Sequence, residues 1–163
     1  MKQKKTLEEQ YPSIDIAYDI ALKSYETTMK RSDVADDGID KLRTLITTIN
    51  LAFLAWIIST AKVGAMFNAW FILSLYIYFS TIVISIIAKS ANGIILVDPK
   101  IIYNKYLHFS KWEFKKNIIY WAGEHYKING EMVANKAKYI VCIFSLFLLE
   151  VVTMGYWLVK YSH

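Results

Sequence analysis

One carboxylic acid stands inside an otherwise apolar stretch near the end of the chain. Glu150 lies at the centre of "SLFLLEVVTMGYW", residues 145–157, a stretch typical of a lipid-embedded helix. A carboxylate at the centre of a bilayer costs about 3 kcal/mol or more, so the chain must either use this group or shelter it from lipid. The sequence leaves both roles open for Glu150: an ionisable functional group, or a polar contact between helices.

Hydroxyl groups recur along a second apolar stretch. They follow one another at i, i+4, i+7 and i+11, which places them on one helix face: Ser74, Tyr78, Thr81 and Ser85. Asn50 lies in a third apolar stretch. Such groups either line a wet pore or pack between helices, where polar contacts contribute about 0.6–2 kcal/mol and hydroxyls often bond to their own helix. We expect these five side chains to line a pore or to face Glu150.

The sequence contains no recognisable catalytic motif. The histidines, His108, His125 and His163, lie far apart and show no metal-binding spacing. The single cysteine, Cys142, excludes an intrachain disulfide. Neither a glycine-rich phosphate loop nor a nucleophile elbow is present. We therefore expect no catalytic residues, no cofactor and no metal ion.

The elements that carry these polar residues are predicted to span a membrane. Of the 163 residues, 55% are hydrophobic and only 20% are charged. Three windows hold no charged residue except Glu150, and each approaches or exceeds the roughly 18 residues that a spanning helix needs: 44–61, 63–88 and 139–159. The alternative, a soluble bundle, would require helices without the usual charged face. The sequence predicts an all-α integral membrane protein with spans at about 44–61, 68–88 and 139–159.

Basic residues predict the orientation of these spans. Of 19 lysines and arginines, eight precede Thr44, nine lie between Lys89 and Lys138, and only Lys62 and Lys160 lie elsewhere. Because basic residues are retained on the cytoplasmic side, residues 1–43 and 89–138 are expected in the cytoplasm and the tail, 160–163, outside. No signal peptide precedes the first span, which is expected to act as the insertion signal.

The cytoplasmic segments are also predicted to be helical. One helix is expected from Pro12 and Ser13 to about Arg31, and a second begins at a cap on Asp33 and leads into the first span. In the loop 89–138, Asp98-Pro99 predicts a short helix, and Ser110 with Glu113 forms a capping box that opens a longer one. This amphipathic helix either lies on the inner leaflet or packs against the N-terminal helices.

A family resemblance accompanies this pattern. The stretch "AYDIALKSYETTMKRSDVADDGIDKLRTLITTINLAFLAWIIS" resembles the SLATT family (SMODS- and SLOG-associating) of small bacterial transmembrane effectors in anti-phage defence. The resemblance covers roughly residues 12–90, and "GIILVDPKIIYNKYLHFSKWEFKKNIIYWAGEHY" is similar to the helical tail of some members. The third span with Glu150 departs from the two-span pattern of that family, and no nucleotide-sensing domain is fused to this sequence.

The resemblance implies a functional collar on the cytoplasmic helices. Its matching positions are Ser24, Tyr25, Arg31, Asp33, Asp37, Asp40 and Lys41. In a single chain these residues predict a solvated helical hairpin whose surface ion pairs contribute about 0–1 kcal/mol. Arranged around an axis in several copies, the aspartates would form acidic rings that attract cations: Asp33, Asp36, Asp37 and Asp40.

The resulting hypothesis is an oligomeric effector of the bacterial inner membrane that forms a pore or disrupts the bilayer on an upstream signal, as in abortive infection. Three helices cannot enclose a useful lumen, so the homo-oligomer is part of the mechanism. Its expected partners are the lipid bilayer, further copies of itself, and a cytoplasmic sensor protein or a nucleotide second messenger, with no nucleic acid. The alternative function is a non-catalytic membrane anchor or scaffold that recruits a cytoplasmic partner.

Overall fold

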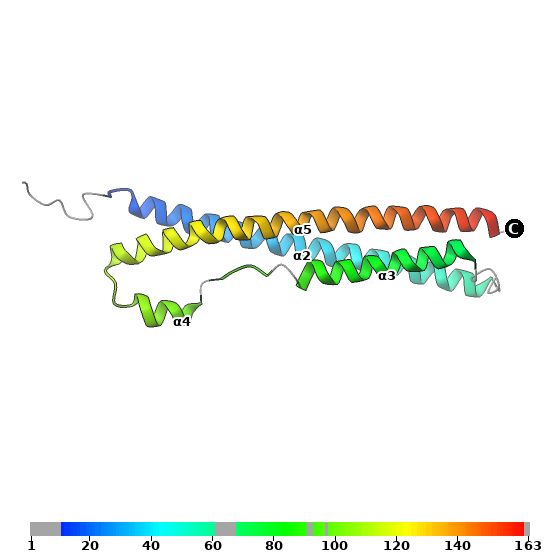
Figure 1. Cartoon of the computed structure of the whole chain (residues 1–163), viewed down its shortest axis with the longest axis horizontal. Coiled ribbons are helices and arrows are strands. Elements are labelled where there is room, and N and C mark those ends of the chain that lie inside the picture. The colour runs from blue at the N-terminus through cyan, green and yellow to red at the C-terminus, as the bar shows by residue number, and fades with distance from the viewer. Residues whose placement is uncertain (1–10, 61–67, 91–92, 97, 162–163) are drawn as a thin grey trace, which may run out of the picture. The chain divides into compact units, whose positions relative to one another are not determined.

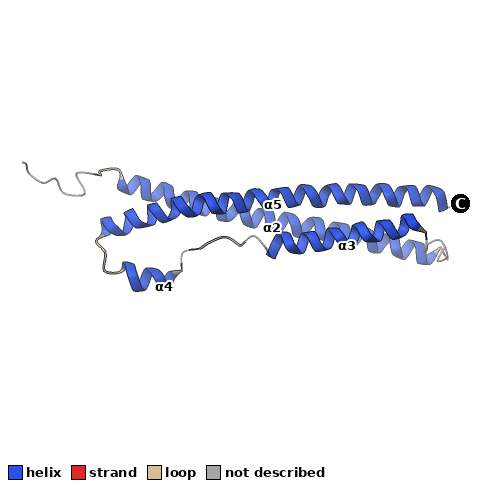
Figure 2. Ribbon diagram, in the orientation of Figure 1, coloured by secondary structure: helices blue, strands red, loops and turns tan. Residues whose placement is uncertain are grey.

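The computed structural model describes residues 11–60, 68–90, 93–96 and 98–161, and within these ranges the chain forms helices and no strand (Figures 1 and 2). The helices are α2 (Ile14–Ser59), α3 (Ala69–Ser90), α4 (Pro99–Ile101), the short π-helix η2 (Ile102–Tyr106) and α5 (Lys111–Tyr161). Three of them, α2, α3 and α5, are long and apolar enough to cross a membrane. The predicted all-α class with three candidate spans is confirmed.

Two helices continue where we expected boundaries. A helix end near Arg31 and a new cap at Asp33 were predicted, but α2 runs through both positions. This prediction was wrong because no glycine or proline interrupts residues 31–33, and the neighbouring side chains of Thr28 and Ser32 are buried in the helical conformation. The third predicted span is likewise the last part of α5, continuous with the amphipathic helix that precedes it.

The predicted helix starts in the middle of the chain are confirmed. The Ser110 backbone N–H donates to Glu113 Oε2 at 3.0 Å, and the Glu113 N–H donates to Ser110 Oγ at 3.3 Å, which is the reciprocal geometry of a capping box. The Ser110 backbone and hydroxyl groups hold the pKa of Glu113 below its ordinary value. At the earlier start, the Lys100 N–H donates to Asp98 Oδ1 at 2.8 Å.

The chain divides into two compact units. The first, called here the N-terminal unit, combines residues up to Ser32 with Ile94–Val133. The second, called the three-helix unit, combines Asp33–Gly93 with Ala134–His163 and contains the three apolar windows. The helices α2 and α5 each contribute to both units, and α3 belongs to the second.

One amide side chain organises the N-terminal unit. Asn129 is fully buried, and its side chain pairs with the backbone of Ile95 in both directions: the Ile95 N–H donates to Oδ1 at 3.0 Å, and Nδ2 donates to the Ile95 carbonyl at 3.2 Å. The Tyr25 hydroxyl donates to the same carbonyl at 2.8 Å. Because a buried backbone group must be hydrogen-bonded, these contacts fix the non-helical segment 93–96 against α2 and α5.

The three-helix unit has two apolar clusters. One is built on Ile39, Ile46, Ala88 and Ile143, and the other on Ile57, Phe71 and Trp157. Each cluster draws on α2, α3 and α5, and Figure 1 shows these three helices running side by side through this unit. The clusters therefore hold all three helices together at two levels.

A seven-residue repeat underlies this packing. On α5, buried side chains recur at every seventh position: Asn129, Lys136, Ile143, Glu150 and Trp157. On α3 the buried side chains of Ser74, Thr81 and Ala88 have the same spacing, and on α2 so do those of Ser32, Ile39 and Ile46. A repeat of seven keeps one stripe of a helix facing its neighbours, as in coiled coils and left-handed transmembrane bundles.

We predict that Asn129→Ala frees the segment 93–96. Removing the amide takes away the acceptor of the Ile95 N–H and the donor to the Ile95 carbonyl, and each hydrogen bond contributes about 1 kcal/mol. Hydrogen exchange measured by mass spectrometry should show faster exchange at Ile95, while Asn104→Ala, a matched change at an exposed position, should leave it unchanged. Equal exchange rates in the two variants would contradict the role assigned to Asn129.

Candidate functional site

Two ion pairs define a common level on the three helices. Lys136 Nζ on α5 lies 2.7 Å from Asp36 Oδ2 on α2, and Lys89 Nζ on α3 lies 2.5 Å from Asp40 Oδ2 on α2. Glu150 lies fourteen residues after Lys136 on α5, and Asn50 lies fourteen residues after Asp36 on α2. Fourteen residues of helix rise about 21 Å, so Glu150 and Asn50 lie at the same height along the bundle. The third helix, α3, runs in the opposite direction. Lys89 pairs with Asp40, which is ten residues before Asn50, so the part of α3 ten residues before Lys89, between Tyr78 and Thr81, lies at the height of Asn50.

The candidate site is therefore a polar layer between the two apolar clusters, in which Thr81 and Glu150 are buried and the other members are half-buried. It consists of Asn50 and Thr47 on α2, Tyr78 and Thr81 on α3, and Glu150 on α5. The Tyr78 hydroxyl lies 3.5 Å from Thr47 Oγ1, which joins α3 to α2 within the layer. The structure thus brings together Glu150, Asn50 and part of the hydroxyl stripe inside one chain.

Glu150 is fully buried and lacks a hydrogen bond to either carboxyl oxygen among the described residues. Asn50 lies close enough to interact with this carboxyl group, but its Nδ2 donates to the Ile46 carbonyl at 2.9 Å, and its contact with Glu150 does not have hydrogen-bond geometry. The amide carries a second N–H, so a small rotation would let Asn50 serve both acceptors. Glu150 is an incompletely satisfied polar group in the core of an apolar bundle.

The hydroxyl stripe faces the interior of the three-helix unit. Ser74, Thr81 and Ser85 are buried and Tyr78 is half-buried. Thr81 Oγ1 donates to the Ile77 carbonyl at 2.8 Å, and Ser85 Oγ donates to the Ile82 carbonyl at 2.7 Å, both within α3. In this arrangement the stripe packs between helices of one chain, and the hydroxyl groups of Thr81 and Ser85 are satisfied by their own helix.

Two of the predicted collar aspartates form contacts between helices. Asp36 and Asp40 pair with Lys136 and Lys89, and we call these four residues the ionic clasp. Lys136 is 3% exposed, and Asp36 provides a compensating charge for its buried ammonium group. Arg43 adds a second contact to Asp40 at 3.0 Å. The clasp joins α2 to both α3 and α5 at one end of the apolar windows.

Asp40 has a lowered pKa within the clasp. The hydrogen bond from Lys89, with the charges of Lys89 and Arg43, holds the pKa of Asp40 below its ordinary value of 3.8. A depressed carboxyl pKa contributes stability above the ordinary value, and this contribution disappears as the pH falls through the lower value of the folded state. The contribution of Asp40 to stability is therefore present at physiological pH and is lost only in strong acid.

The remaining collar residues do not form one cluster in the described chain. Asp37 pairs with Lys41 at 2.6 Å on the exposed surface of α2, and Asp33 is also exposed. Ser24 and Arg31 belong to the N-terminal unit, where they line a cavity of about 280 Å³ with Tyr126. Tyr25 contacts Ile95 as described above. Whether these residues act together in an oligomer stays a prediction.

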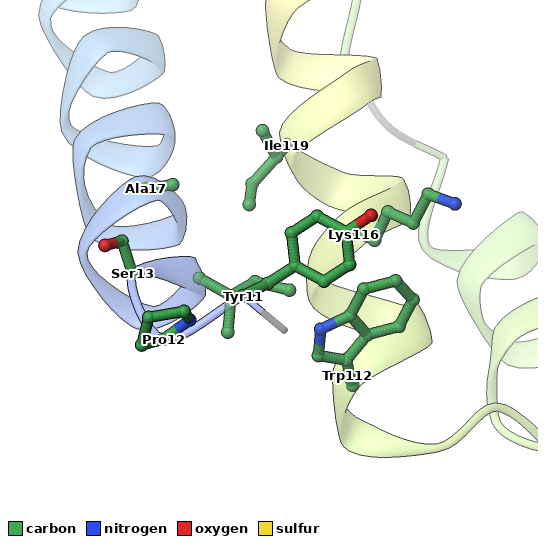
Figure 3. Close-up of a pocket in the computed structure, with 8 residues that line it drawn as sticks. Tyr11, Pro12, Ser13, Ala17, Trp112, Lys116 and Ile119 are labelled. Atoms are coloured by element: carbon green, nitrogen blue, oxygen red, sulfur yellow. The ribbon is translucent and has the colours of Figure 1, made fainter. Parts of the chain in front are cut away.

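A larger cavity of about 450 Å³ lies in the N-terminal unit, between the first turns of α2 and α5. Figure 3 shows the Tyr11 ring beside the Trp112 ring, with Ala17 and Ile119 on the opposing helices. The two ring centroids are 5.4 Å apart, and Lys116 Nζ lies 5.4 Å from the centre of the Trp112 ring. Lys115 also pairs with Asp15, so aromatic and ionic contacts fasten the start of α2 to that of α5.

Sequence analysis missed the basic partners in the clasp and the buried Asn129. A signal was present, because Asp36, Asp40, Lys89 and Lys136 all lie within about two turns of an apolar window and carry opposite charges. The seven-residue spacing of Asn129, Lys136 and Glu150 was a second signal. It was obscured because polar side chains occupy positions that a hydrophobic pattern reserves for apolar ones.

Among the residues that the structure describes, no group of three or more histidine, cysteine or acidic side chains has the arrangement of a metal site. A scan of protein-family models finds no match to this chain, and comparisons with curated proteins and solved structures find none either. The resemblance to the SLATT family stays a prediction.

We predict that Lys136→Met destabilises the three-helix unit by about 2 kcal/mol, because Asp36 then remains half-buried without its cation. Lys41→Met, which breaks a fully exposed pair, should cost less than about 0.5 kcal/mol. Thermal unfolding in detergent measures both changes, and the exchanged pair Asp36→Lys with Lys136→Asp should recover part of the loss. Equal losses for the two methionine variants would exclude a clasp.

We predict that Glu150 is a neutral carboxylic acid in the folded protein, since an ionised carboxylate without hydrogen bonds in lipid costs about 3 kcal/mol or more. Dicyclohexylcarbodiimide, which enters lipid and adds to protonated carboxyl groups, should modify Glu150 and leave the exposed Glu131 intact. Peptide mass spectrometry reads the adducts. Absence of the Glu150 adduct under conditions in which the reagent remains active would contradict a neutral acid.

Proposed function

We propose that this chain is an oligomeric effector of the bacterial inner membrane, closed at rest, that permeabilises the bilayer when an upstream signal opens its three-helix unit. The observation that carries this proposal is the polar layer with the fully buried carboxyl group of Glu150, whose oxygens have no well-formed hydrogen bond among the described residues. The antiviral setting rests on the resemblance to SLATT effectors alone.

The polar layer supports a unit that can exist in two states. An apolar core would hold three helices together without any ionisable group, whereas a carboxyl group between them makes the closed packing less stable. If the helices separate in lipid, Glu150, Asn50 and the hydroxyl stripe lose their neighbours and must find polar partners elsewhere. Other copies of the chain and a water-filled lumen between them provide such partners.

The remaining parts have corresponding roles in this proposal. The distribution of basic residues predicts that residues 1–43 and 89–138 are cytoplasmic, and in that orientation the ionic clasp would lie at the inner end of the spans. A clasp at that position would keep the unit closed until a cytoplasmic event separates α2 from α3 and α5. Several copies would then align the aspartates released from the clasp, Asp36 and Asp40, around the inner mouth.

Membrane depolarisation tests this function. We predict that expression in bacteria lowers the signal of a potential-sensitive dye and arrests growth. Glu150→Leu should reduce depolarisation roughly tenfold at equal protein level, because an apolar side chain of similar size stabilises the closed packing by about 1–2 kcal/mol. Glu131→Leu, the same change at an exposed position of α5, should depolarise like the unaltered protein. An unchanged dye signal on expression of the unaltered protein would refute the proposal.

A second candidate is a membrane anchor that recruits a cytoplasmic partner. It is favoured by one observation: Thr81 and Ser85 donate to carbonyl groups of their own helix, so these two hydroxyl groups are satisfied there. In that case Glu150 is a packing group, and its replacement by glutamine is harmless. Affinity capture through the N-terminal unit would then recover one stoichiometric partner without any ion leak.

A further inference from the structure

A pocket between α3 and α5 combines an apolar floor with an uncompensated cation. It encloses about 440 Å³ and is lined by Ile84 of α3 and by Asn135, Lys138, Tyr139 and Cys142 of α5. The four α5 residues have the spacing i, i+3, i+4 and i+7, so they share one helix face. Ile84 and Tyr139 form the floor, since both pack against the apolar cluster around Ile143.

The ammonium group of Lys138 in this pocket has no carboxylate partner among the described residues, unlike those of Lys136 and Lys89. Lys136 and Lys89 are neutralised by the aspartates of the ionic clasp. Lys138, only two residues from Lys136, lies on a different face of α5 and is exposed; within the described ranges no carboxylate pairs with it. Its Nζ donates to Asn135 Oδ1 at 3.3 Å, which holds the ammonium group near the pocket and leaves two donors for a ligand.

The pocket lies at the boundary of an apolar window. Tyr139 begins the third window, and the same face of α5 continues into it through Cys142, Leu146 and the exposed Leu149. A ligand that fits must therefore carry an anionic group at one end and an apolar chain at the other. Basic pockets between transmembrane helices on the cytoplasmic side bind anionic lipid headgroups in this way.

We propose that this pocket binds one anionic phospholipid. The phosphate accepts hydrogen bonds from Lys138, the Tyr139 ring lies at the level of the headgroup, and an acyl chain follows Cys142 and Leu149 along α5. The proposal requires that the chain spans the membrane, and it does not depend on pore formation. A bound lipid would pack against both α3 and α5 beside the ionic clasp.

Cys142 makes occupancy measurable, because it is the single cysteine of the sequence and is exposed in the pocket. The purified protein is placed in nanodiscs of phosphatidylcholine alone or of phosphatidylcholine with phosphatidylglycerol, and the rate of alkylation by N-ethylmaleimide is followed by mass spectrometry. We expect phosphatidylglycerol to slow alkylation about fivefold, since a lysine near an anionic surface contributes about 1 kcal/mol. Free glycerol phosphate should give no protection.

Two matched variants decide whether the site is specific. Lys138→Gln should abolish the protection, whereas Lys160→Gln, the same change at the other end of the third window, should retain it. Circular dichroism and size-exclusion chromatography confirm that both variants are folded. Equal alkylation rates in the two membranes would overturn the proposal. So would an equal loss of protection in both variants, or protection that changes with the number of protein copies per nanodisc and not with the lipid.

Discussion

Polar groups inside lipid must find their partners within the protein, and the three-helix unit is arranged around this constraint. Its helices carry hydroxyl, amide and carboxyl groups at positions that would otherwise face hydrocarbon. Packing α2, α3 and α5 along stripes of seven-residue spacing turns Ser74, Thr81 and Glu150 inward, whereas other hydroxyl groups such as Thr48 and Ser145 and the large apolar side chains outside the clusters remain on the surface. Burial of Glu150 is the costliest consequence of this packing if the helices cross lipid, and it is the observation on which the proposed function rests.

Charged side chains near the ends of the apolar windows also need compensation. Asp36 and Asp40 lie within two turns of hydrocarbon, and each is compensated by a lysine on another helix. A comparison of Lys136 with Lys138 shows that the helix face on which a lysine lies decides whether it is buried in an ion pair or exposed. Two residues apart, one is buried in an ion pair between helices, while the other is exposed beside a pocket in which an anionic lipid can compensate it.

These features are consistent with the resting state of the membrane effector that we propose. The clasp and the two apolar clusters favour the closed unit, and the polar layer between them reduces that preference. A bundle can respond to a modest signal when the free-energy difference between its packings is small, and the proposed function requires this of the three-helix unit. Tyr25, Asn129 and the aromatic contact of Tyr11 with Trp112 give the N-terminal unit defined internal contacts, as a receiving element for such a signal requires.

The sequence by itself determined the helices and their apolar windows, because backbone hydrogen bonding, helical spacing and capping are local: the Ser110–Glu113 box formed as predicted. Local preference failed at Asp33, where burial of neighbouring side chains kept α2 continuous. Only the tertiary structure decided that Asp36 pairs with Lys136, that Asn129 binds the Ile95 backbone, and that Glu150 shares a level with Asn50. These contacts join residues 34 to 100 positions apart, and their partners depend on which helix faces meet and at what register, which no local spacing specifies.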